Sequence, residues 1–290
     1  MLKSLAHNPK RFLLYEGTPP FARASDTEVM PYADFYEAPA DISTGHIMLA
    51  FPGGAYSFLS KLSSTDYGKF FAERGISVLS VNFRLGSQGY DGRAICADAL
   101  AAVRLAQRLC ETSGHLDSNQ VGLIGTSAGG HLAGMLSTGA AEILLSSEPS
   151  AAGLPLEWRP SFALYCYAVL SLETPLRHLE TAQNFLGDGV LDTTAQRAAS
   201  PIKHVASDHC RSFLWHTAED TEVALENTLD MYQALRAQGV ATELHVYEKG
   251  PHALGLASDL IGDEQLHWAN DAARWIVNRP IAPKTPPPSP

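Results

Sequence analysis

The stretch Val121-Gly-Leu-Ile-Gly-Thr-Ser-Ala-Gly-Gly-His-Leu-Ala-Gly134 decides the fold of this chain. Its first five residues are apolar or small and predict a strand covered on both faces, whereas the run from His131 onward predicts a helix. Between them, Gly125-Thr-Ser-Ala-Gly129 reads G-x-S-x-G, a tight turn that exposes a serine. The pattern predicts Ser127 as a nucleophile, with the N–H of Ala128 facing a developing oxyanion. Glycine-rich loops without chemistry share this spacing, and the strand and helix beside it favour the catalytic interpretation.

Strand-like and helix-like runs alternate along the rest of the chain. Further strands are predicted at 46–51, 76–82, 161–167, 213–216 and 242–248, and helical spacing of apolar residues occurs at 94–109, 223–237 and 266–277. This alternation predicts an α/β fold, with a mostly parallel sheet and helices on both of its faces. Residues 137–159 lack a regular signal and are expected to form a surface excursion.

The chain divides into three expected parts. Residues 45–279 hold all the predicted elements and form one catalytic domain; a boundary at Pro155 or Pro160 is the alternative. Residues 1–44 are expected to pack on or cover the site. Residues 280–290 contain six prolines, which neither continue a helix nor join a sheet, and form a frayed tail.

Composition and charge exclude several classes of protein. The 290 residues include 21 Lys and Arg against 31 Asp and Glu, a net charge of −10. With 45% hydrophobic and 18% charged residues, the chain is not a disordered acidic protein. The absence of a basic cluster argues against nucleic acid and against an anionic membrane surface as partners. The charge names no substrate, and the oligomeric state stays open.

The sequence shows neither an apolar run long enough to span a bilayer nor the apolar core of a secretion signal. The cysteines are scattered and fit buried thiols in a reducing compartment, at positions Cys96, Cys110, Cys166 and Cys210. We therefore expect a cytoplasmic protein, and its predicted chemistry requires neither a metal nor an organic cofactor.

A second glycine-rich segment, Phe51-Pro-Gly-Gly-Ala-Tyr56, follows the predicted strand at 46–51. Loops in this position supply the second oxyanion donor of acyl-transfer enzymes, because glycine lets a backbone N–H approach a carbonyl closely. The donor is Gly54 or Ala55, and the sequence does not choose between them. A simple turn out of the strand is the alternative. Tyr56 and Phe58 are expected to wall the substrate pocket, with a place in the core as the alternative.

A serine nucleophile needs a histidine base and an acid that orients it, in the chain order serine, acid, histidine. His252 follows the predicted strand at 242–248, where such a sheet gathers its active site. Glu219 and Asp220 both follow the strand at 213–216, and the spacing to the next helix favours Asp220. The other histidines are expected to cap, pack or face solvent; they include His131, His204, His209, His216 and His245.

These motifs resemble those of α/β-hydrolase esterases of the BD-FAE-like, acetylxylan-esterase-like family. The resemblance is carried, in family order, by PGGAYSFLS (52–60), GISVLSVNFRLG (75–86), VGLIGTSAGGHLAG (121–134), NFLGD (184–188), SFLWHTAEDTEVALENTL (212–229) and GVATELHVYEKGPHALGLA (239–257). It implies Ser127 as nucleophile, His252 as base and Asp220, rather than Glu219, as acid. It also implies short or medium acyl esters as substrates, including acetyl groups on plant polysaccharides.

The chain departs from the family pattern at four alanines. Ala55 stands where the family usually has the third glycine of the oxyanion loop, and Ala253 where a glycine usually follows the base. Ala168 and Ala224 replace frequent prolines. None of these changes removes a reacting group, and together they are expected to reshape the acyl pocket.

Two other functions are compatible with the same motifs. A serine peptidase of the prolyl-oligopeptidase kind shares the residue order, but it normally carries a large N-terminal propeller, and about 120 residues precede the elbow here. A non-catalytic binding module on the hydrolase fold usually lacks one triad residue, whereas all three are present in this chain.

Overall fold

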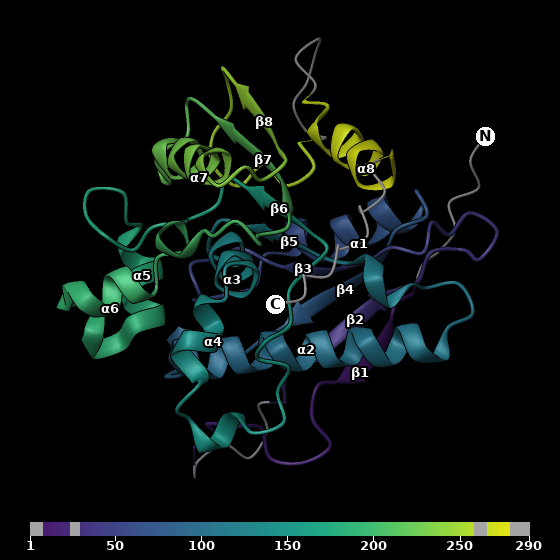
Figure 1. Cartoon of the computed structure of the whole chain (residues 1–290), viewed down its shortest axis with the longest axis horizontal. Helices are drawn as coiled ribbons and strands as arrows, with labels where there is room; N and C mark the ends of the chain where they lie inside the picture. Colours follow the sequence, from purple (N-terminus) through teal and green to yellow (C-terminus); the bar gives the residue numbers. More distant parts are fainter. Residues whose placement is uncertain (1–7, 24–29, 258–265, 279–290) are drawn as a thin grey trace, which may run out of the picture.

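Eight strands form one sheet in the order β1-β2-β4-β3-β5-β6-β7-β8 (Figure 1). The computed structural model describes residues 8–23, 30–257 and 266–278. β3 to β8 run parallel to one another, and β2 is antiparallel to both of its neighbours. The strands are β1 (Lys10–Leu13), β2 (Tyr32–Tyr36), β3 (Ile47–Phe51), β4 (Ser77–Asn82), β5 (Val121–Thr126), β6 (Phe162–Cys166), β7 (Arg211–Thr217) and β8 (Thr242–Tyr247).

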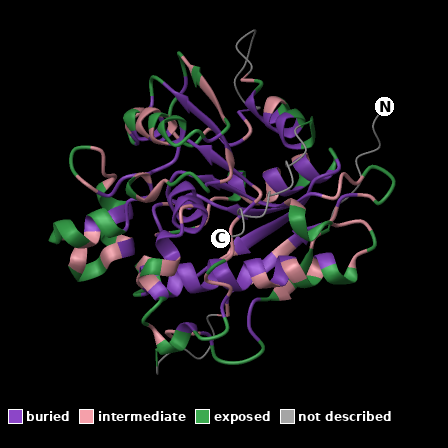
Figure 2. Ribbon diagram, in the orientation of Figure 1, coloured by how far each residue is buried: buried purple, intermediate pink, exposed green. Residues whose placement is uncertain are grey.

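Helices cover both faces of the sheet. They are α1 (Thr65–Ala72), α2 (Gly92–Thr112), α3 (Ala128–Ser137), α4 (Ala140–Leu145), α5 (Leu179–Leu186), α6 (Thr193–Ala198), α7 (Glu226–Ala237) and α8 (Trp268–Asn278). Because successive strand residues point to opposite faces, Leu49 joins the core of α2, α3 and α7, whereas Met48 and Ala50 join the core of α1 and α8. The central strands are buried, and exposed positions gather on outer helices such as α5 and α6 (Figure 2).

The α/β prediction is confirmed, and its strands and helices correspond to β3–β8, α2, α7 and α8. Residues 137–159, expected to be irregular, include the short helix α4, which buries Ala140, Ala141 and Leu145 and is too short to give a clear period. Within the described ranges, no helix combines the length and apolar character needed to cross a bilayer.

The described residues of the segment 1–44 extend the sheet, whereas residues 1–7 and 24–29 lie outside the described ranges, so its expected place on or over the site stays a prediction. Its described residues include β1 and β2, and β2 extends the sheet by pairing with β4, with Ala33 opposite Val81. Ala33 and Phe35 are buried in the core, which explains why this segment joins the sheet. The expected boundary at residue 45 therefore falls within one sheet. The predicted tail at 280–290 lies outside the described residues.

A buried ion pair ties the segment after β4 to α2. The Nη2 and Nε atoms of Arg84 donate to the two carboxylate oxygens of Asp98 at 2.8 and 2.9 Å, and the Arg84 backbone N–H donates to Oδ2 at 2.9 Å. Tyr15 adds a hydrogen bond from its hydroxyl at 3.0 Å. Both charged side chains are at most 1% exposed, so water cannot replace either partner.

We predict that Asp98→Asn lowers the free energy of unfolding by about 3–5 kcal/mol, because it leaves the buried Arg84 guanidinium without a counter-charge. Urea denaturation measures the loss. Asp34→Asn is the matched control, since Asp34 makes a similar two-point pair with Arg11, whose side chain is 57% exposed. The control should lose at most about 1 kcal/mol; equal losses would contradict the prediction.

Candidate active site

Ser127 lies on a strained turn between β5 and α3. Its backbone has φ 52° and ψ −121°, a conformation that L residues rarely adopt. The turn is also crowded, because a Cβ at Gly129 would lie 2.0 Å from the carbonyl oxygen of Phe51 at the end of β3. The glycine spacing therefore lets the elbow pack directly on the neighbouring strand and holds the serine at the carboxyl edge of the sheet.

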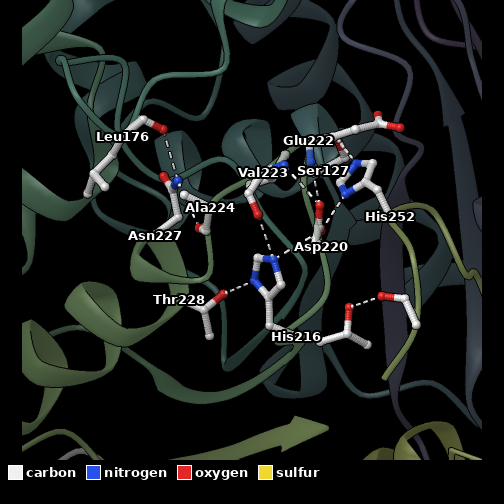
Figure 3. Close-up of polar contacts among 12 residues, drawn as sticks. Ser127, Leu176, His216, Asp220, Glu222, Val223, Ala224, Asn227, Thr228 and His252 are labelled. Atoms are coloured by element: carbon white, nitrogen blue, oxygen red, sulfur yellow. Dashed lines mark hydrogen bonds and ion pairs between the residues drawn. The ribbon is translucent and has the colours of Figure 1, made fainter. Parts of the chain in front are cut away.

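Three side chains from different loops form a hydrogen-bonded chain (Figure 3). The Nε2 atom of His252 lies 2.9 Å from Oγ of Ser127, and its Nδ1 atom lies 2.6 Å from Oδ2 of Asp220. Ser127 follows β5, Asp220 follows β7 and His252 follows β8, so parallel strands bring them to one edge. Since Nδ1–H donates to the carboxylate, Nε2 of the neutral imidazole is free to accept the serine proton.

The carboxylate of Asp220 is buried and has four donors. Oδ1 accepts the backbone N–H groups of Glu222 and Val223, both at 2.9 Å, and Oδ2 accepts from His252 and, at 3.1 Å, from His216. Burial acts to raise the pKa of Asp220, but the hydrogen bonds from His216, His252 and Val223 outweigh it and hold the pKa well below its ordinary value. The carboxylate is therefore ionised at neutral pH.

Glu219, the alternative acid, has a different environment. It is exposed, and its carboxylate accepts the backbone N–H of Gly250 at 3.1 Å. Of these two adjacent acids, Asp220 is the one that contacts His252.

His216 is a residue that the sequence analysis did not assign to the site. It is fully buried at the end of β7, and its Nε2 atom contacts both Asp220 and, at 3.0 Å, the carbonyl oxygen of Val223. The signal in the sequence was its position four residues before the acid. His131, by contrast, packs in the core, where burial lowers its pKa to about 4.

The loop after β3 carries the expected oxyanion donors. Within the described residues, neither Gly54 nor Ala55 donates its backbone N–H to another group, so both are available. Gly54 has φ +126°, and a Cβ there would meet the carbonyl oxygen of Phe58 at 2.2 Å. Nδ2 of Asn184 on α5 lies 2.8 Å from both the Ala55 carbonyl oxygen and Ser57 Oγ. Ala128 is the first residue of α3, so its N–H has no partner within the helix.

Backbone strain is concentrated in the loops that surround Ser127. Five of the seven described non-glycine residues with positive φ belong to these loops, namely Ala55, Tyr56, Ser127, Tyr167 and Ala253. At Ala55 and Ala253, a glycine would adopt this backbone without strain. The surrounding contacts must therefore hold both alanines in the left-handed region.

A cavity of about 160 Å³ opens beside Ser127. Phe58 lines it as expected, with 60% of the residue exposed. Residues that the sequence analysis did not assign to a site also line it, and include Thr126, Tyr167, His178, Glu180 and Glu222. Thr126 ends β5, the next three residues lie between β6 and β7, and Glu222 follows β7, so no local pattern in the sequence marks them as a group.

Tyr56 does not line this pocket, in contrast to the expectation from the sequence. It is 1% exposed, and its ring packs against Phe83 and Phe185. Its hydroxyl lies 2.8 Å from Nδ1 of His131. Because His131 Nε2 lies 2.7 Å from the carbonyl oxygen of Ala199, Nε2 carries the proton and Nδ1 accepts from Tyr56.

We predict that Tyr56→Phe lowers the free energy of unfolding by about 1–3 kcal/mol, because it leaves the buried Nδ1 of His131 without a donor. Phe58→Ala, at an exposed position, should change it by roughly 0.5 kcal/mol or less. Urea denaturation of both variants measures the difference. A larger loss for Phe58→Ala than for Tyr56→Phe would contradict the prediction, because it would indicate that Phe58 rather than Tyr56 is the buried residue.

A model of the BD-FAE family matches residues 33–235. The acetylxylan esterase of Xylanibacter ruminicola is 28% identical over 246 residues, which are 83% of this chain and 47% of that protein. Endo-1,4-beta-xylanase B of Butyrivibrio fibrisolvens is 25% identical over 214 residues, which are 73% of this chain and 33% of that protein. The chain thus spans about half the length, or less, of these curated relatives.

Solved structures share the fold over nearly the whole chain. The acetyl ester-xyloside bifunctional hydrolase from Caldicellulosiruptor lactoaceticus superposes with a TM-score of 0.81 at 28% identity, covering 95% of this chain and 98% of that one. The carboxylesterase Cest-2923 from Lactobacillus plantarum shares the fold with a TM-score of 0.66 at 20% identity, covering 88% and 91% of the two chains. The family match spans most of the sheet and the elbow, so this α/β-hydrolase chain belongs to the BD-FAE family.

Proposed function

We propose that this protein is a serine esterase that hydrolyses short acyl esters, with Ser127 as nucleophile, His252 as base and Asp220 as acid. The observation that carries the proposal is the continuous hydrogen-bonded chain from Ser127 Oγ through His252 to Asp220, with distances of 2.9 and 2.6 Å. It begins on a strained turn beside unpaired backbone N–H groups. The names of two relatives at 28% identity each, an acetylxylan esterase and an acetyl ester-xyloside bifunctional hydrolase, support the same reaction.

In the first half of the reaction, Ser127 Oγ attacks the ester carbonyl carbon while His252 Nε2 accepts its proton. The carbonyl oxygen becomes an oxyanion, which the N–H groups of Ala128 and of Gly54 or Ala55 stabilise by about 3 kcal/mol per donor. The ionised Asp220 stabilises the imidazolium. The carbon–oxygen bond to the alcohol then breaks, and His252 returns its proton to the leaving alcohol oxygen.

The second half releases the acid. Water attacks the acyl carbon bonded to Ser127, and His252 takes a proton from that water. The same donors stabilise the second oxyanion, after which the bond to Ser127 breaks and the serine recovers its proton from His252. Each step uses side chains and amides of this chain, without a metal or an organic cofactor.

The size of the pocket favours a small acyl group. At about 160 Å³, the cavity beside Ser127 is smaller than the roughly 300–1,000 Å³ typical of sites for larger ligands. A long acyl chain would extend beyond it.

The rim of the pocket favours an uncharged, hydroxylated alcohol group. Glu180 and Glu222 are exposed carboxylates there, and Phe58 offers an exposed aromatic face. Carboxylates accept hydrogen bonds from hydroxyl groups and repel other anions. An acetylated neutral carbohydrate fits this chemistry, in keeping with the relative named as an acetylxylan esterase.

We predict that Ser127→Ala abolishes hydrolysis of phenyl acetate and labelling by a fluorophosphonate, and that Asp220→Asn lowers kcat by roughly four orders of magnitude. Glu219→Gln is the matched control and should retain most activity, because Glu219 contacts a loop amide rather than the base. Steady-state kinetics and labelling measure both effects. A silent Asp220→Asn with a crippled Glu219→Gln would reverse the assignment of the acid.

The same proteins discriminate between the competing functions. Cleavage of a proline-containing amide in preference to an acetyl ester would indicate a peptidase. A folded wild-type protein that neither hydrolyses esters nor reacts with the fluorophosphonate would indicate a binding module, since labelling requires an activated serine.

We predict that the double variant Glu180→Gln/Glu222→Gln raises kcat/KM for 4-carboxyphenyl acetate by about tenfold, because two carboxylates no longer repel the anionic substrate. The value for phenyl acetate should change little. Glu157→Gln, at an exposed acid outside the pocket lining, is the control. In the wild type, the ratio of kcat/KM for phenyl acetate to kcat/KM for 4-carboxyphenyl acetate should also fall at high salt. If the ratio of the kcat/KM values for the two substrates is unchanged in the double variant, these carboxylates do not take part in substrate selection.

A further inference from the structure

One oxygen of Asp220 is shared by two imidazoles. Oδ2 lies 2.6 Å from Nδ1 of His252 and 3.1 Å from Nε2 of His216, and both histidines are drawn around the carboxylate in Figure 3. We propose that His216 is a positioning residue, whose Nε2–H holds Oδ2 of Asp220 where that oxygen can accept the Nδ1–H of His252. This inference rests on the proposed esterase function and concerns the same site.

The contacts of His216 fix which nitrogen carries the proton. Nε2 lies between two acceptors, the Asp220 carboxylate and the Val223 carbonyl oxygen at 3.0 Å, so Nε2 carries a proton in either charge state of the ring. Nδ1 lies 2.7 Å from the hydroxyl of Thr228 on α7, which can donate or accept. The ring is therefore hydrogen-bonded at both nitrogens and points its N–H at the acid.

His216 supplies a restraint that the acid loop itself lacks. The backbone N–H groups of Glu222 and Val223 hold Oδ1, which leaves Oδ2 to be oriented by side chains. His252 is one such side chain, but its ring gains and loses a proton at Nε2 during catalysis. His216 is fully buried, and the side chain of Asp220 has no exposed area, so water cannot take over its hydrogen bond. Its removal should loosen the acid.

The position of Oδ2 decides how well the charge of Asp220 stabilises the imidazolium of His252. Without His216 that oxygen is held less firmly against Nδ1–H, so the ascending limb of the pH–rate profile should move to lower pH. The other titratable groups around the base are Tyr167, His178, Glu180 and Glu222. They remain in place in a His216 variant, as does Thr228 on the far side of the ring, so a shift can be assigned to His216.

The experiment measures the rate of fluorophosphonate labelling and kcat/KM for phenyl acetate between pH 5 and pH 9, over roughly two units on each side of the ordinary histidine pKa. For His216→Leu we expect about a tenfold loss in kcat and an ascending limb displaced to lower pH. His216→Gln keeps an N–H donor, so it should restore part of the lost kcat and reverse part of the displacement of the limb. Thr228→Val, which removes the other partner of the ring, should shift the limb in the same direction by a smaller amount.

His209→Gln is the matched control, because His209 is also buried and hydrogen-bonded, to the Cys210 carbonyl oxygen at 2.7 Å, but lies outside the site. It should leave the limb unchanged. Circular dichroism and urea denaturation select variants that are folded. If folded His216→Leu and Thr228→Val label with the wild-type pH profile, the inference is overturned. If the wild type itself is not labelled, the proposed function fails as well, and the two results are distinguishable.

Discussion

The close contact between the nucleophile turn and the end of β3 is the constraint on which the rest of the site depends. Gly129 packs its backbone against the Phe51 carbonyl, so the helix start and the oxyanion loop are pressed together. A side chain at Gly129 would push them apart and move Ser127 away from Gly54 and Ala55. The positive φ of Ser127 is a cost of this arrangement, of order 1–3 kcal/mol, and the buried packing of β5 and α3 offsets it.

The site depends secondly on a buried charge, the carboxylate of Asp220. A buried carboxylate is unfavourable unless donors surround it, and Asp220 meets this condition with two amides of its own loop and two imidazoles. The amides come from residues two and three positions further along the chain, so the acid is held largely by local backbone. The imidazoles come from β7 and from the loop after β8, so they link the acid to the sheet.

The sequence was most informative where a function imposes a local pattern. The elbow, the second glycine loop and the alternation of strands and helices were all recognisable, because each depends on residues close together in the chain. β1 and β2 were missed because their sequences, KRFL and YADFY, include charged residues and lack the nearly continuous apolar runs of the central strands. The expected role of Tyr56 failed for another reason: the residues next to a reactive loop alternate between pocket and core, and the core partner His131 is 75 positions away.

The wall of the pocket was beyond reach of the sequence, since Tyr167, His178 and Glu180 have no spacing that marks them as neighbours of Ser127. They nevertheless share one origin. All three lie in the long connection between β6 and β7, whereas Ser127, Asp220 and His252 follow β5, β7 and β8. The connection therefore walls the pocket and also supports the reacting groups, because the Val169 N–H donates to the Ser127 carbonyl oxygen at 3.1 Å and the Tyr167 ring packs against His252. A segment exchanged to reshape the pocket would have to keep these contacts, together with the Asn184 amide that holds the carbonyl of Ala55.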